Sequence, residues 1–156
     1  MKAKFFLFSI LSLITISSAF SQDNSVTEEE LMRYATAMDS INEMSAEVIV
    51  LITDMVKNTE LMNAVRYNEL SKIIDDETKL TEANATPEEI SFIKEVAEKK
   101  DSATAHINEA FQSLAKDYVT VPTYTKVKKA LSTDAALKEK YDALMTELAK
   151  DNPVAQ

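Results

Sequence analysis

Apolar residues recur three and four positions apart between Thr27 and Lys57, the spacing that gives an α-helix one continuous apolar face. A capping box opens this segment, because Thr27 is followed three residues later by Glu30, and Val26 before the cap can contact Leu31 as a hydrophobic staple. The pattern predicts one long helix of roughly eight turns. Its apolar stripe consists of Leu31, Tyr34, Met38, Ile41, Val48, Ile52 and Met55.

The middle of this predicted helix, Val48 to Ile52, is apolar on every side. A helix that is apolar all round is normally buried by neighbouring elements. We therefore expect this segment to lie at the centre of the fold.

Shorter helices and a second long helix follow. The pattern predicts a helix from about Ala64 to Ile74 and a helical turn around Leu80. A second capping box, Thr86 with Glu89, and a proline at the first helical position predict a long helix from Thr86 to Tyr118. The chain is then expected to break at Val121 and Pro122, restart at Thr123, and end in a helix from about Asp134 to Ala149.

The two long helices superpose at an offset of 59 residues, which places Thr27 on Thr86 and Glu30 on Glu89. Beyond them the match resumes at an offset of 57, which pairs Tyr67 with Tyr124. We infer a tandem duplication, with repeat one over about 27–85 and repeat two over about 86–150. The predicted fold is all-α: an up-and-down helical bundle built from two tandem repeats, each a long helix followed by shorter ones.

The first 21 residues have the layout of a secretory signal peptide, with Lys2 and Lys4 before an apolar run from Phe5 to Ile16. Cleavage after Ser21 would leave residues 22–156 as a single all-helical domain in the periplasm or outside the cell. Because no other apolar stretch is long enough to span a bilayer, we expect no membrane insertion after cleavage.

Composition excludes several functions. The chain has no cysteine and no glycine, which removes disulfides, thiolate metal sites and the glycine-rich loops that cradle nucleotide phosphates. Without Lys2 and Lys4 of the leader, 15 basic and 26 acidic residues remain, a net charge of −11. This charge disfavours binding to nucleic acid or to an anionic membrane.

The start and the end of this pattern resemble an uncharacterised family of secreted bacterial helical domains. An acidic helix start runs into an aromatic residue and alanines, and a tyrosine-led short helix precedes an acidic cap and a leucine. The residues concerned are Glu29, Glu30, Leu31, Tyr34, Ala35 and Ala37, then Tyr124, Val127, Ala130, Asp134 and Leu137. Ala135 replaces the proline that usually follows the acidic cap. The resemblance implies an exported helical fold and carries no catalytic residues.

Candidate metal and cofactor ligands are few. His106 is the only histidine, and a ferritin-like site would need a glutamate at position 103, which is Ala103. The methionines fall mainly on the core stripe, where packing explains them. We predict no cofactor and no metal, with weak divalent-cation, copper or haem binding as the alternative. The lysines at 126, 128 and 129 are expected to form a solvated basic face.

Lys100 interrupts the apolar stripe of the second long helix at the position that matches Ile41 in the first. Thr104 lies one turn further on, and Ser45 is its counterpart in the first repeat. A lysine in such a place reaches solvent along its stem or pairs with a carboxylate. The alternative is a polar layer between the long helices that binds an anionic or hydroxylated ligand.

Tyr67 and Tyr124 occupy one repeat position, where each ring is expected to pack on its own long helix, with stacking against a ligand as the alternative. Together with Lys100, Thr104 and Ser45 they are the candidate ligand-binding residues. The sequence favours an exported, non-catalytic module that binds a protein partner, an envelope component or a small ligand. The alternatives are an envelope enzyme that uses carboxylates with Lys100 in a buried pocket, or a periplasmic metal or haem carrier.

Overall fold

The computed structural model describes residues 25–152, so the predicted signal peptide and its cleavage position lie outside the described residues. Within this range the chain forms helices and no strand, which confirms the all-α fold class. The six α-helices are α1 (Glu28–Asn58), α2 (Ala64–Ser71), α3 (Glu77–Glu82), α4 (Pro87–Ser113), α5 (Val121–Leu131) and α6 (Ala135–Leu148). A π-helical turn, Leu114–Tyr118, extends α4, and a 3-10 turn, Ala149–Asp151, follows α6.

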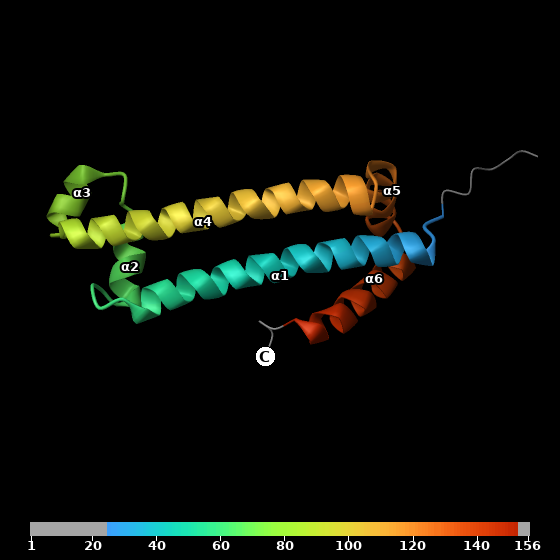
Figure 1. Cartoon of the computed structure of the whole chain (residues 1–156), viewed down its shortest axis with the longest axis horizontal. Coiled ribbons are helices and arrows are strands. Elements are labelled where there is room, and N and C mark those ends of the chain that lie inside the picture. The colour runs from blue at the N-terminus through green and yellow to red at the C-terminus, as the bar shows by residue number, and fades with distance from the viewer. Residues whose placement is uncertain (1–24, 153–156) are drawn as a thin grey trace, which may run out of the picture.

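The two long helices, α1 and α4, lie side by side in opposite directions and set the length of the molecule (Figure 1). The short helices gather at its two ends, α2 and α3 at one and α5 at the other (Figure 1). From the second end α6 runs back along α1 (Figure 1). Asn152 follows α6 and donates a 3.4 Å hydrogen bond to Asp39 of α1.

The helix starts follow their local sequence signals. Both predicted capping boxes form, with Thr27 and Glu30 at α1 and with Thr86 and Glu89 at α4. Side chains of Asn63, Asp76 and Asp134 cap α2, α3 and α6. The structure differs at three boundaries: α2 ends at Ser71 instead of Ile74, α4 ends at Ser113 with a π-helical turn up to the predicted end at Tyr118, and α5 begins at Val121 instead of Thr123. The earlier start is possible because Pro122 falls in the first turn, where its missing N–H costs no hydrogen bond.

Two separate hydrophobic clusters hold the ends of the molecule together. Each cluster joins the first turns of one long helix to the short helices of the other half of the chain. The α5–α6 cluster is built on buried Leu31, Tyr34, Ala37, Val119 and Val127, with residues of α6 packed against them. The α2–α3 cluster is built on buried Met62, Leu70, Leu80 and Ile93.

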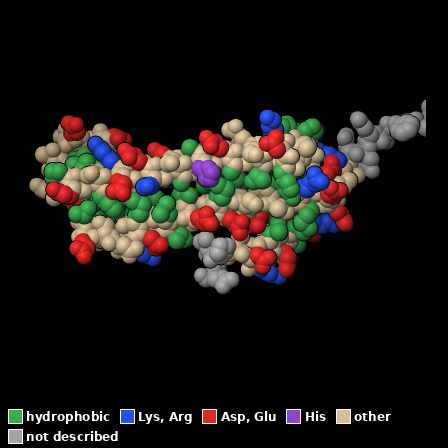
Figure 2. Space-filling model, in the orientation of Figure 1, with side chains coloured by type: hydrophobic (Ala, Val, Ile, Leu, Met, Phe, Trp, Pro, Cys, Tyr) green, Lys and Arg blue, Asp and Glu red, His purple; other side chains and the backbone are tan. Residues whose placement is uncertain are grey.

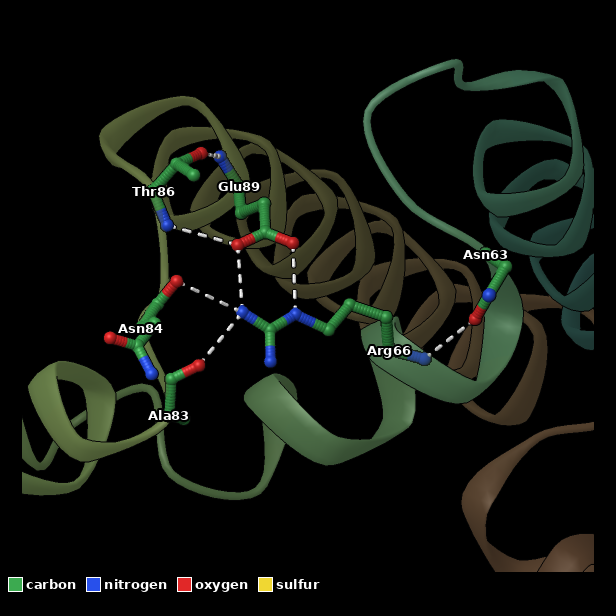
Figure 3. Close-up of polar contacts among 6 residues, drawn as sticks. All are labelled: Asn63, Arg66, Ala83, Asn84, Thr86 and Glu89. Carbon is green, nitrogen blue, oxygen red and sulfur yellow. Dashed lines mark hydrogen bonds and ion pairs between the residues drawn. The ribbon is translucent and has the colours of Figure 1, made fainter.

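A bidentate ion pair closes the end that holds the α2–α3 cluster (Figure 3). Arg66 of α2 donates from Nε to Oε1 of Glu89 at 2.9 Å and from Nη2 to Oε2 at 3.0 Å. The same guanidinium donates to the carbonyls of Ala83 at 3.1 Å and Asn84 at 3.3 Å. Arg66 therefore ties α2 both to the first turn of α4 and to the connection that precedes it (Figure 3).

The corresponding pair at the other end joins Lys126 of α5 to Glu30 of α1. The Nζ of Lys126 donates to Oε2 at 2.8 Å and to Oε1 at 3.0 Å. The expected solvated role is therefore wrong for Lys126, which is half-buried in this contact. Hydrogen bonds to the charged form lower a carboxyl pKa, so Lys126 lowers the pKa of Glu30 and Arg66 lowers the pKa of Glu89.

The expectation that the apolar middle of α1 lies at the centre of the fold is wrong. Ile49 is 67% exposed, Val50 is 42% exposed and Leu51 is 46% exposed. The reason is that α2, α3 and α5 pack near the two ends, so among the described residues this segment of α1 packs mainly against α4 (Figure 1).

Replacing a leucine inside the α2–α3 cluster should destabilise the protein far more than replacing an exposed one. Leu70 is fully buried and Leu61 is 49% exposed. We expect Leu70→Ala to lower the free energy of unfolding by about 2–5 kcal/mol, because it leaves a cavity. Leu61→Ala should change it by less than about 1 kcal/mol. Urea denaturation of both variants measures the difference, and equal losses would contradict this description of the core.

Removing the charge of Glu89 tests the ion pair separately from the helix cap, since glutamine can still serve a capping box. At neutral pH we expect Glu89→Gln to cost about 1–3 kcal/mol of unfolding free energy. Glu29→Gln, which breaks an exposed pair with Arg33, should cost no more than about 0.5 kcal/mol.

The cost should also depend on pH. A carboxyl whose pKa falls below its ordinary value of 4.5 on folding adds stability above that value and loses it as the pH falls through the lower, folded value. The difference in unfolding free energy between wild type and Glu89→Gln should therefore become smaller when urea denaturation is repeated at acid pH. If this difference in unfolding free energy stays constant down to pH values well below 4.5, the ion pair is not the cause of the difference.

Candidate binding surface between the long helices

An apolar groove runs between α1 and α4 midway along the molecule. This central groove encloses about 310 Å³, and its lining residues are Met44, Glu47, Val48, Leu51, Ala103, His106 and Ile107. Hydrophobic side chains follow the seam between the two long helices in the space-filling view (Figure 2). The groove thus has apolar walls, with one polar side chain from each helix, Glu47 and His106.

Exposed apolar residues lie on more than one face of α1 at this level of the helix. Leu51 lines the groove at 46% exposure, and Ile49 and Val50 next to it are also exposed. Exposed apolar surface is a candidate interaction site, and Met44 adds a flexible side chain to the groove wall. The candidate residues chosen from sequence did not include this groove. The sequence feature that could have indicated the groove is the segment Val48 to Ile52, which is apolar on every side, in a chain with few other long helices to bury it.

Ser45, Lys100 and Thr104 lie on the middle turns of the long helices. The Ser45 hydroxyl donates to the carbonyl of Ile41 at 2.7 Å, and the Thr104 hydroxyl donates to the carbonyl of Lys100 at 2.8 Å. Each hydroxyl thus bonds to the preceding turn of its own helix, a common arrangement for Ser and Thr within helices. Lys100 is exposed, as expected for a lysine whose amine stays in solvent.

Tyr67 and Tyr124 lie at opposite ends of the molecule. The ring centroid of Tyr124 is 5.3 Å from that of Tyr34 and 5.7 Å from that of Phe111, so it contacts both long helices. The ring of Tyr67 lies 6.5 Å from Phe92 of α4, which is the long helix of the other half of the chain. Pairs at these separations stabilise packing, and both tyrosines belong to the hydrophobic clusters at the ends.

Burial raises the pKa of three tyrosines in the end clusters. Desolvation, with smaller effects from Tyr124 and Tyr141, raises the pKa of Tyr34 to about 12. Burial likewise raises the pKa of Tyr67 and of Tyr141. Raised values disfavour the phenolate, so these hydroxyls are poor candidates for a catalytic base near neutral pH.

An irregular backbone links α4 to α5. The π-helical turn Leu114–Tyr118 is followed by Thr120, whose φ is 73°. Positive φ is strained for a β-branched residue. The turn buries Val119 at 1% exposure in the α5–α6 cluster, so packing of Val119 compensates for the strain beside it. Sequence patterns did not indicate this feature.

Among residues 25–152, no three His, Cys, Asp or Glu side chains lie close enough together to hold a metal ion. None of the helices in the described part of the chain is long and apolar enough to cross a membrane. No family model, curated protein or solved structure matches the chain.

The raised pKa of Tyr34 predicts a loss of stability in alkali. A group whose pKa is about 10 unfolded and about 12 folded stabilises the fold fully below pH 10 and loses this contribution as the pH rises through 12. The contribution is on the order of 2–3 kcal/mol. Between pH 9 and 12 the melting temperature should fall less steeply with pH for Tyr34→Phe than for wild type. Tyr118→Phe, at an exposed position, should follow wild type; an unchanged slope in Tyr34→Phe would contradict the assignment.

Proposed function

We propose that the protein is an exported, non-catalytic helical module that acts by binding, in the periplasm or outside the cell, and that the central groove is its binding surface. The observation that carries this proposal is the exposure of the groove wall at Leu51, 46%. Apolar surface of this kind is stabilised when a partner removes it from water. The acidic chain argues against nucleic acid as that partner.

A protein segment suits this groove better than a small ligand. Ligand pockets bury most of their ligand inside a concave site, whereas the central groove is open to solvent between the two antiparallel helices α1 and α4. An amphipathic helix can lay its apolar face into such a channel. The clusters and ion pairs at the two ends support this mode of binding, because they hold α1 and α4 at a fixed spacing before the partner arrives.

We also infer that the fold is an up-and-down bundle that arose by tandem duplication of a unit of 57–59 residues. Three paired features support this: two capping boxes, two ion pairs that link a short helix to the opposite capping glutamate, and two end clusters. The resemblance to secreted bacterial helical domains is part of the same proposal.

Photo-crosslinking in producing cells tests the binding surface. We would place p-benzoylphenylalanine at Leu51 in the central groove, and at Leu61 as a control of similar exposure outside it. The account predicts a discrete protein adduct from position 51 and none of the same mass from position 61. The same adducts from both positions, or none from position 51, would count against the groove as the binding surface.

A further inference from the structure

We propose that the segment bound in the central groove is a basic amphipathic helix, whose cationic side chains lie along the α1 wall. This inference rests on the proposed function and adds the chemistry and the orientation of the partner. Its basis is a difference in charge between the two walls of the groove.

The α1 wall is acidic. Glu47 lines the central groove, and Glu43 lies one helical turn before it. Asp54 lies two turns after Glu47, and residues four and seven apart share one face of a helix. Three carboxylates thus follow this side of the groove over about three turns of helix.

None of these three carboxylates forms an ion pair with another residue between 25 and 152. Glu30 and Glu89, in contrast, are paired with Lys126 and Arg66. The charges along the α1 wall are therefore available to a partner.

The α4 wall carries less negative charge than the α1 wall, with the exposed carboxylate of Glu109 one turn after His106, although its apolar residues resemble those of α1. At the positions 59 residues after Glu43, Glu47 and Asp54 the chain has Ser102, His106 and Ser113. Lys99, two turns before His106, adds a positive charge on the same side of α4. The apolar pairs are conserved in type, since Met44 and Val48 correspond to Ala103 and Ile107, and all four line the groove.

These features select one class of partner. Apolar residues at the i, i+3, i+4 and i+7 positions of a helix would fill the groove. Lysines or arginines along one flank of that helix would meet the carboxylates of α1, and the charge difference between the walls disfavours the reversed placement. A second copy of this chain fits less well, because each copy carries a strong net negative charge.

The test uses a synthetic helical peptide that carries leucine at those four spacings and lysine along one flank, with the purified protein. One control peptide replaces each lysine by glutamate. The key variant combines Glu43→Gln, Glu47→Gln and Asp54→Asn. Its matched control combines Glu60→Gln, Glu82→Gln and Glu139→Gln, three exposed carboxylates elsewhere on the protein. Unchanged circular dichroism and melting temperature would show that each variant is folded.

We expect the lysine peptide to bind and the glutamate peptide to bind far more weakly. The groove variant should lose about tenfold or more in affinity and most of its salt dependence, while the matched control keeps both. Calorimetric titration at low and at physiological salt measures these differences. Equal affinity of the groove variant and the matched control for the lysine peptide would overturn the inference.

Leu51→Ser separates failure of this inference from failure of the proposed function. If Leu51→Ser abolishes peptide binding and the groove variant does not weaken it, the groove binds but the charge assignment is wrong. If neither the lysine peptide nor the glutamate peptide binds wild type, or Leu51→Ser leaves their binding unchanged, both proposals fail. A dimer in sedimentation that Leu51→Ser dissociates would identify a second copy as the occupant and would likewise overturn the inference.

Discussion

A glutamate in the first turn of each long helix has two sets of partners and so connects the two halves of the chain. Glu30 accepts from the backbone of Thr27 and from Lys126, and Glu89 accepts from the backbone of Thr86 and from Arg66. The backbone contact starts the helix, and the cation brings a short helix from the other half of the chain. The positions of α2 and α5 thus depend on carboxylates that would otherwise only cap a helix.

This arrangement concentrates packing at the ends of the molecule. The α2–α3 and α5–α6 clusters cover the first turns of α4 and α1, and the middle of the two long helices relies on contact between them. The apolar residues Ile49, Val50 and Leu51 therefore remain partly exposed. The packed clusters and the proposed binding surface thus lie on different parts of the same helices.

Local signals were sufficient to predict the helices, because caps and apolar spacing act within a few residues. The ion pairs could not be predicted, since Arg66 and Glu89 are 23 residues apart and Lys126 and Glu30 are 96 apart. The middle of α1 was misassigned for a different reason. Apolar residues indicate that burial of their surface is favourable, but they do not show whether the same chain or another molecule buries it. Ser45 and Thr104 looked like a polar layer because a sequence does not show that each hydroxyl bonds to its own helix.

The central claim is that binding takes place at the middle of the long helices and leaves the packed ends unchanged. Backbone amide chemical shifts, followed in two-dimensional NMR spectra as the lysine-rich amphipathic peptide is added, test this claim most directly. The account predicts changes concentrated on residues that line or flank the groove, such as Glu47, Leu51 and His106, with small changes at Leu70 and Val127 in the end clusters. Changes concentrated at the end clusters, with the groove residues unaffected, would contradict it.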